Sequence, residues 1–247
     1  MSSSREKPIL IIDGKRLDGR SFDQLRPLSI TTNVVPNADG SAFIEWGNNK
    51  IIAAVYGPKE ALPKHTQDPE RAVIKCRYAM SPFSSAEEHG SSKPNRRAIE
   101  ISKITKEVFE NVILIDEFPG GEINIYVDVL QSDGGTRAAG ITAAAAAVAS
   151  AGLPMRDIPY AVSVGKADGH LILDMNKIED NYSDADVPMT ICPRTKEIIL
   201  LQMDGSFDGS KEFREAYSMV LKAGEEISRI QKEALKEPYT KIIDKYR

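Results

Sequence analysis

The chain has 247 residues, of which 41% are hydrophobic and 28% charged, a composition typical of a soluble globular protein that can bury a sizeable core. Its formal net charge of −4 excludes an overall basic surface, so any contact with nucleic acid must come from local clusters of Arg and Lys. No apolar segment approaches the roughly 18 residues of a membrane span, and the N-terminus lacks the apolar core of a secretory signal, so we expect a cytoplasmic protein without membrane contacts.

In the first half, alternating and β-branched residues predict five strands, over residues 28–34, 41–46, 51–56, 72–79 and 123–129. Polar loops, residues 57–71 and 81–95, flank the fourth strand. Asn95 is a good helix N-cap, and the spacing of the apolar residues after it predicts a helix from Arg96 to about residue 114.

In the second half, an Ala-rich segment over residues 136–151 is followed by Gly152, which predicts a closely packed helix. Strands are predicted at residues 160–165, 170–174, 187–192 and 197–201, and a long helix from Lys211 to about residue 236. Residues 174–186 read as an acidic loop between strands. The order predicts an α+β chain of two similar halves, residues 17–150 and 153–236.

Cys76 and Cys192 are the only cysteines, and neither belongs to a CxxC or metal-spaced set. We therefore expect two buried free thiols in a reducing compartment. His89 and His170 have no partner visible in the sequence, and we assign them no role. No His and Cys set has zinc spacing, and no Ser, His and Asp set stands out.

A candidate anion site lies where the predicted strand 123–129 leads into the Ala-rich helix. Gly135 could present free backbone N–H groups, Thr136 a hydroxyl and Arg137 a guanidinium, which together would hold a phosphate. A tight turn with a solvated arginine is an equally good interpretation of the pattern.

Arg96 and Arg97 are predicted in the first turn of a helix, where the helix dipole disfavours positive charge by roughly 0.3–1 kcal/mol each. A bound anion would compensate this cost. A solvated basic pair remains the alternative.

The acidic residues 174–186 include Asp180 and Asp186, which are spaced to enter one site from the two ends of a short loop. Carboxylates beside a phosphate site can bind Mg²⁺ or donate a proton to a leaving oxygen. Acidic loops are more often simply solvated.

Lys64, His65 and Arg71 lie in the first polar loop. A cation and an imidazole on such a loop could contact an RNA backbone or stack on a base. An ordinary exposed loop is the competing interpretation.

Together these segments resemble the RNase PH family of phosphorolytic 3′ exoribonucleases and, within it, the catalytic subunits of archaeal exosomes. The resemblance runs from LDGR at residues 17–20 to the final helix. It is carried by NADGSA (37–42), AAVYGP (53–58), MSPFS (80–84), RR (96–97), LQSDGGTR (130–137), VGKADG (164–169), ED (179–180) and AD (185–186).

The resemblance implies an RNase PH fold, with two β-α-β halves of the ribosomal protein S5 domain 2-like type. It also implies a hexameric ring, a trimer of heterodimers with an inactive paralogue, beneath a cap of S1 and KH or zinc-ribbon proteins. Single-stranded RNA would be the substrate and inorganic phosphate the co-substrate, with Mg²⁺ a further expected cofactor.

Carried onto this sequence, the resemblance implies roles for individual residues. Gly135, Thr136 and Arg137 match the phosphate site, and Arg96 and Arg97 match the arginines that hold the RNA 3′ end and phosphate. Asp180 matches the catalytic acid and Asp186 the second acid, often assigned to metal.

Two positions depart from the family pattern. Lys64 stands where close relatives have an arginine, which keeps the charge but loses bidentate phosphate binding. The turn reads Asp-Gly-Gly-Thr-Arg where many relatives have Asp-Ala-Gly-Ser-Arg, and we expect the shape and the hydroxyl to be preserved. A homohexameric RNase PH that trims tRNA ends and a non-catalytic, RNA-holding ring subunit remain alternatives.

Overall fold

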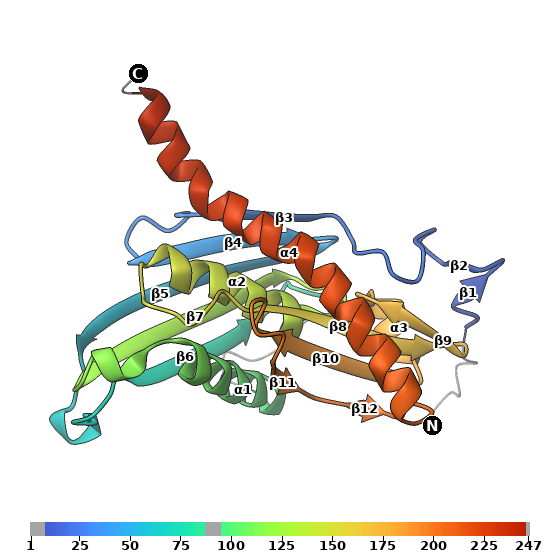
Figure 1. Cartoon of the computed structure of the whole chain (residues 1–247), viewed down its shortest axis with the longest axis horizontal. Coiled ribbons are helices and arrows are strands. Elements are labelled where there is room, and N and C mark those ends of the chain that lie inside the picture. The colour runs from blue at the N-terminus through green and yellow to red at the C-terminus, as the bar shows by residue number, and fades with distance from the viewer. Residues whose placement is uncertain (1–7, 87–94, 246–247) are drawn as a thin grey trace.

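A computed structural model describes residues 8–86 and 95–245, and shows a five-stranded sheet in the first half of the chain (Figure 1). The strands lie in the order β3-β4-β5-β7-β6, and all neighbours are antiparallel except β6 and β7, which are parallel. Their bounds are β3 (Leu28–Thr32), β4 (Gly40–Trp46), β5 (Asn49–Glu60), β6 (Val73–Met80) and β7 (Gly121–Gln131).

The second half forms another sheet, antiparallel throughout, in the order β11-β10-β8-β9, with β12 also paired to β10. Its strands are β8 (Tyr160–Ala167), β9 (His170–Leu173), β10 (Ala185–Ile191), β11 (Ile198–Leu201) and β12 (Asp204–Gly205). Near the N-terminus, β1 (Ile11–Ile12) and β2 (Lys15–Arg16) form a separate two-stranded antiparallel sheet.

Helix α2 (Thr136–Ser150) lies between the two sheets and packs on strands of both. Its five consecutive alanines, residues 143–147, are fully buried, because a small side chain lets a helix approach two layers at once. Gly40 of β4 shows how close the approach is: a Cβ there would lie 2.4 Å from the carbonyl oxygen of Ala147. The prediction of a closely packed Ala-rich helix is confirmed.

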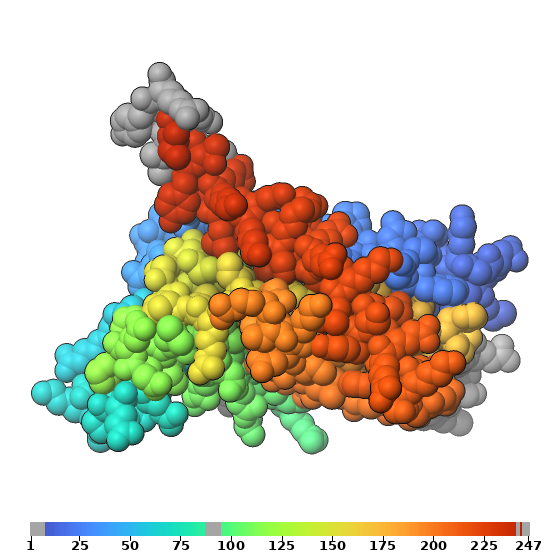
Figure 2. All heavy atoms as spheres, viewed as in Figure 1, coloured from blue at the N-terminus to red at the C-terminus, as the bar shows by residue number. Residues whose placement is uncertain are grey.

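The other long helices cover the outside of this core. Helix α1 (Arg96–Val112) packs on β6, and α4 (Ser210–Lys245) crosses β8 and β3. Figure 2 shows the C-terminal part of α4 projecting beyond the body of the protein. The single-turn 3-10 helices η1 (Lys64–Thr66) and η2 (Ile115–Glu117) lie in loops.

Most predicted elements are found, but several differ, and the short strands β1, β2 and β12 were not predicted. The acidic residues 174–186 are not simply a loop, because α3 (Lys177–Tyr182) forms within them, held by a capping box between Asn176 and Glu179. Strand β5 continues to Glu60, into the predicted loop. Helix α4 extends to Lys245 despite Pro238, beyond the predicted end near residue 236.

One apolar core includes residues of both sheets, α1, α2 and α4. The two halves therefore share their core, and the division into residues 17–150 and 153–236 stays a prediction about domains. Both cysteines are free; Cys192 is buried, whereas Cys76 is only partly buried. No helix in the described part of the chain is long and apolar enough to cross a membrane.

Candidate functional site

A cavity of about 150 Å³ lies where the N-terminal ends of α1 and α2 meet α3 and β10. Six of the residues singled out in the sequence line it: Arg97, Gly135, Thr136, Arg137, Asp180 and Asp186. They come from both halves of the chain, so the shared core positions this site.

The start of α2 forms one wall of the cavity. Gly135, its N-cap, has φ of 67° and ψ of 18°, and Gly134 also has a positive φ of 71°, a left-handed conformation that glycine adopts without strain. No described side chain caps this helix, so its first N–H groups remain available to an anion. Thr136 is buried, and its Oγ1 accepts a hydrogen bond from Tyr78 Oη at 3.0 Å.

The two arginines of the cavity come from different helices. Arg137 makes a long ion pair with Glu100, 3.8 Å between Nη2 and Oε1, and its buried Nε has no partner among the described residues. Arg97 belongs to the first turn of α1, whose N-cap, Asn95, accepts a hydrogen bond from the Ala98 N–H. The predicted N-cap is therefore confirmed.

Arg96 lies one position earlier, is exposed and does not line the cavity. Because Asn95 already takes one N–H of α1, the uncapped N-terminus of α2 is the better place for an anion.

Burial raises the pKa of Asp180 and of Asp186, the two acids of the cavity that the sequence singled out. For Asp180, burial outweighs Arg97 and Arg137, whose positive charges lower the pKa. For Asp186, burial and the neighbouring Asp180 raise the pKa to about 6, against the opposing charge of Arg137. The buried Oδ1 of Asp186 has no hydrogen-bond partner among the described residues.

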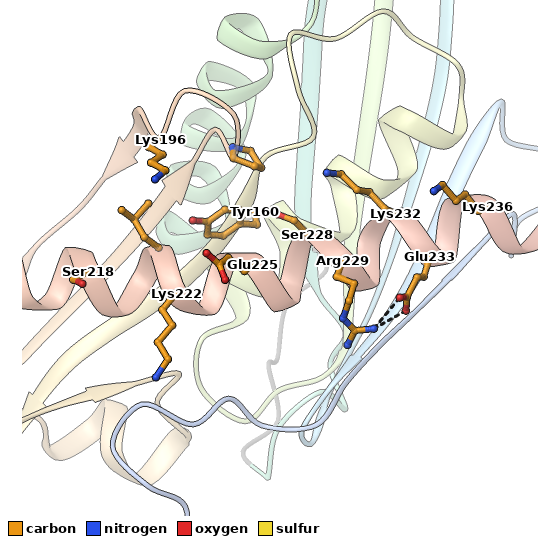
Figure 3. A pocket seen from close by; sticks show the side chains of 13 residues that line it. Tyr160, Lys196, Ser218, Lys222, Glu225, Ser228, Arg229, Lys232, Glu233 and Lys236 are labelled. Atoms are coloured by element: carbon orange, nitrogen blue, oxygen red, sulfur yellow. Dashed lines mark hydrogen bonds and ion pairs between the residues drawn. The ribbon is translucent and has the colours of Figure 1, made fainter.

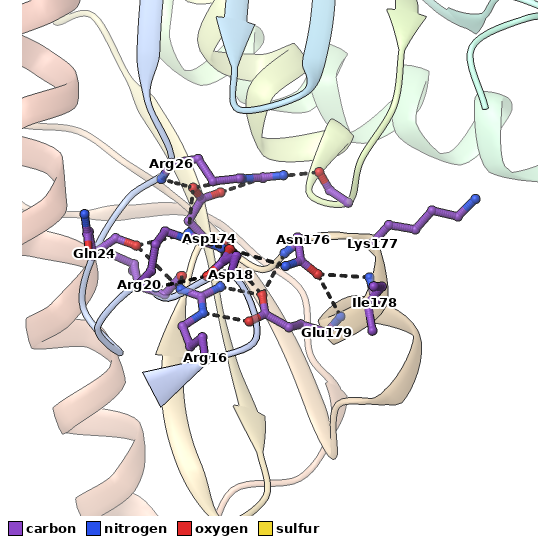
Figure 4. Close-up of polar contacts among 12 residues, drawn as sticks. Arg16, Asp18, Arg20, Gln24, Arg26, Asp174, Asn176, Lys177, Ile178 and Glu179 are labelled. Atoms are coloured by element: carbon purple, nitrogen blue, oxygen red, sulfur yellow. Dashed lines mark hydrogen bonds and ion pairs between the residues drawn. The ribbon is translucent and has the colours of Figure 1, made fainter. Parts of the chain in front are cut away.

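Buried arginines from the N-terminal segment fix the elements that carry these groups (Figure 4). Arg16 makes a bidentate contact with Glu179, the residue before Asp180, with 2.7 Å between Nε and Oε1. Arg26 binds Asp174 through Nε and Nη2 at 3.1 and 2.7 Å, and also donates to the carbonyl oxygen of Asp133, in the turn before α2.

These pairs correct the interpretation of residues 174–186 as a solvated acidic run. Asp174 is 3% exposed and Glu179 is fully buried, because each has an arginine partner about 150 residues away in the sequence.

Two further polar residues of the cavity were missed by sequence reasoning. Ser163 of β8 is buried and lines the wall beside Gly135. Asp204 of β12 lies directly opposite Asp186 in the strand pairing. Neither stands in a motif, and only the strand register brings them to the site.

The structure does not bring Lys64, His65 and Arg71 to the cavity. Their loop joins the end of β5 to the start of β6, beside the first residues of β7, whereas the cavity follows the last residues of β7. That strand has 11 residues, which corresponds to roughly 35 Å. The exposed Arg71 is paired with the half-buried Asp68, with 3.0 Å between Nε and Oδ2.

The histidines and the possible metal ligands lie as follows in the structure. His170 stacks on Phe22 with ring centroids 4.9 Å apart, and His89 lies outside the described residues. Within residues 8–86 and 95–245, no group of three or more His, Cys, Asp or Glu side chains could hold a metal ion.

Another cavity, of about 710 Å³, follows the exposed side of α4 (Figure 3). Its lining includes five basic and two acidic side chains, and Arg229 and Glu233 pair with each other at 2.8 Å. It contains none of the candidate site residues and no convergent set of arginines and acids, so the smaller cavity is the candidate active site.

Residues 24–154 match domain 1 of the 3′ exoribonuclease family, RNase PH, and residues 157–212 match domain 2. The exosome complex component Rrp41 of Thermoplasma volcanium is 54% identical over 92% of this chain and 91% of its own length. That of Pyrococcus furiosus is 51% identical over 93% of this chain and 91% of its own length.

Among solved structures, rice (Oryza sativa) Rrp46 superposes with a TM-score of 0.80 at 26% identity, covering 90% of this chain and all of that one. A chain of the Archaeoglobus fulgidus exosome with RNA bound to the active site gives a TM-score of 0.74 at 22% identity, covering 90% of this chain and 92% of that one, a likeness of fold. The chain belongs to the RNase PH family of 3′ exoribonucleases.

Proposed function

We propose that this chain is the catalytic RNase PH-like subunit of an exosome core ring, and that it shortens single-stranded RNA from the 3′ end by phosphorolysis. The observation that carries the proposal is the cavity that combines two arginines, an uncapped helix N-terminus and the acids Asp180 and Asp186. The relatives named exosome complex component Rrp41, at about half identity over nearly the whole chain, support the assignment.

The positive groups of the cavity suit inorganic phosphate as the attacking group. Thr136, Arg137 and the first N–H groups of α2 would hold the phosphate, and Arg97 would hold the terminal phosphodiester. Phosphoryl transfer depends mainly on positioning and on neutralising charge in the transition state, which these groups supply.

In the proposed reaction, a phosphate oxygen bonds to the phosphorus of the last phosphodiester and the bond to the 3′ oxygen of the preceding nucleotide breaks. Asp180 donates a proton to that leaving oxygen, a role favoured by its raised pKa. The products are a nucleoside diphosphate and an RNA shorter by one nucleotide. Excess nucleoside diphosphate would drive the reaction backward as RNA tailing.

The oxygen atoms of the two carboxylates are also suitable ligands for a magnesium ion. Asp180 and Asp186 offer two carboxylates, one with a buried unpartnered oxygen, and Mg²⁺ is commonly held by one or two carboxylates together with water and substrate phosphates. When bound, the ion would neutralise charge on the reacting phosphates.

The loop with Lys64, His65 and Arg71 would contact RNA before it reaches the cavity. Lys64 and Arg71 are exposed cations, and the separation of roughly 35 Å along β7 suits an RNA chain several nucleotides long. Arg96, exposed beside the cavity, would contact the RNA backbone near the 3′ end.

The proposed assembly is a trimer of heterodimers with an inactive RNase PH-like paralogue, beneath S1 and KH or zinc-ribbon cap proteins. A self-sufficient homohexamer acting on tRNA 3′ ends is the second candidate. A non-catalytic ring subunit is disfavoured, because this chain retains the paired arginines and both acids.

The test is to incubate single-stranded RNA with the purified chain, alone and with its paralogue, with and without phosphate. We expect nucleoside diphosphates only with phosphate and efficient release only in the mixture. Full activity of the chain alone would favour the homohexamer. Nucleoside monophosphates released without phosphate would contradict the proposal.

A further inference from the structure

Tyr78 of β6 lies beneath the candidate phosphate site without lining it. Its side chain is 3% exposed and packs in the main core, so only its hydroxyl group points to the site. That hydroxyl donates to Thr136 Oγ1 at 3.0 Å, at the first residue of α2.

This hydrogen bond determines what the Thr136 hydroxyl can do. A buried tyrosine hydroxyl must donate its proton, since an unsatisfied buried donor is costly, and Thr136 Oγ1 accepts it here. Threonine in the middle of a helix usually donates its own proton to a carbonyl of the preceding turn. Because α2 begins at Thr136, there is no preceding turn, and the proton is free to point into the cavity.

Tyr78 also contacts the other helix that contributes to the cavity. Its backbone N–H donates to Ser102 Oγ at 2.8 Å, and Ser102 Oγ donates to the carbonyl oxygen of Ala98 at 2.6 Å, next to Arg97. Burial raises the pKa of Tyr78, while Arg97 and Arg137 lower it, so both arginines lie within electrostatic reach of its hydroxyl.

We propose that Tyr78 is a positioning residue for phosphate, because its hydroxyl fixes the Thr136 hydroxyl as a hydrogen-bond donor to the anion. The inference rests on the proposed function of the cavity and adds a residue that no motif indicates. Tyr78 acts through Thr136 and does not touch the phosphate itself.

The substitution Tyr78→Phe removes only the hydroxyl and keeps both the ring in the core and the backbone bond to Ser102. We expect it to weaken phosphate binding by roughly three- to tenfold, the range for one hydrogen bond, while kcat at saturating phosphate changes by less than about twofold. Tyr160→Phe is the matched control. Tyr160 is equally buried, and its hydroxyl lies 3.4 Å from the carbonyl oxygen of Val220, away from the cavity.

The measurements are the phosphate dissociation constant by titration calorimetry and the phosphate KM of the active assembly. Weaker binding in Tyr78→Phe but not in Tyr160→Phe supports the inference; equal binding in the two variants overturns it. The two proposals can fail separately. If the wild-type protein bound phosphate but released no nucleoside diphosphate, the proposed function would be contradicted. The comparison of phosphate binding between Tyr78→Phe and Tyr160→Phe would still test the role of Tyr78.

A double-mutant comparison separates positioning from general loosening of the core. In a Thr136→Val background there is no hydroxyl to orient, so Tyr78→Phe should add no further loss of phosphate affinity. In a Thr136→Ser background, which retains the hydroxyl, the loss should persist. If Tyr78→Phe lowered phosphate affinity as much in the Thr136→Val background as in the wild type, Tyr78 would not act through the Thr136 hydroxyl, and the inference would be overturned.

Discussion

Asp186 shows how the chemistry of the site conflicts with stability. Its carboxyl group is partly buried, lies close to Asp180, and has an oxygen without a described hydrogen-bond partner, so its pKa is raised to about 6. At neutral pH the folded protein must therefore keep a charge that its surroundings disfavour. Such a group is typical of a functional site.

We predict that Asp186→Asn stabilises the protein while reducing its activity. A raised carboxyl pKa means that the folded state binds the proton more tightly, so the contribution of Asp186 to the free energy of unfolding falls as the pH rises from about 4 to 6. Asparagine does not titrate, so the variant should gain about 1–3 kcal/mol at pH 7.5 and about half of that at pH 5.

Urea denaturation at the two pH values measures this difference. Glu117→Gln, at an exposed acid on η2, is the control and should change stability little at either pH. A loss of stability in Asp186→Asn, or a gain independent of pH, would contradict the described environment of Asp186.

At the scale of elements, the turn from β7 into α2 depends on its two glycines. A Cβ on Gly134 would lie 2.5 Å from the carbonyl carbon of Asn176, just before α3, and its φ of 71° is already unfavourable for other residues. The turn is therefore packed against the element that carries Asp180.

We predict that Gly134→Ala lowers the free energy of unfolding by about 2–4 kcal/mol and also weakens phosphate binding. Gly152, after α2, provides the control, because its φ is 73° and nothing lies within 4 Å of an added Cβ. Gly152→Ala should cost only about 1–2 kcal/mol of backbone strain and leave phosphate binding unchanged. Thermal unfolding and phosphate titration measure the two effects. If Gly134→Ala and Gly152→Ala changed stability and phosphate binding equally, a clash between a Cβ at position 134 and Asn176 would be excluded.

The elements differ in how far the sequence predicts them. Strands and helices with regular apolar spacing, such as α1 with its Asn95 cap, follow from local patterns. The environment of Glu179 does not, because its partner Arg16 is 163 residues away and only the folded chain brings them together. For the same reason Asp204 and Ser163 were missed, whereas the glycine turn and the paired arginines stood in recognisable motifs.

At the scale of the whole molecule, the two halves are bound together both by the shared core and by polar contacts. Trp46, the only tryptophan, lies in the first sheet and donates its indole N–H to Asp174 of the second half at 2.9 Å. Its fluorescence therefore reports on the contact between the halves.

We predict that the halves unfold in one transition. Loss of either half would expose the buried faces of α2, so neither sheet should remain folded alone. Trp46 fluorescence and far-ultraviolet circular dichroism should give the same midpoint in guanidinium. A fluorescence change that precedes the loss of secondary structure would show that the halves separate first.

In the proposed function, the cavity uses phosphate to remove nucleotides from RNA with the help of Asp180. The most direct test measures nucleoside diphosphate release from single-stranded RNA at several phosphate concentrations, comparing the wild-type assembly with one containing Asp180→Ala. We expect phosphate-dependent release by the wild type and loss of this release in the Asp180→Ala assembly, which should still form and still bind phosphate. Near-normal release by Asp180→Ala would contradict the proposed function.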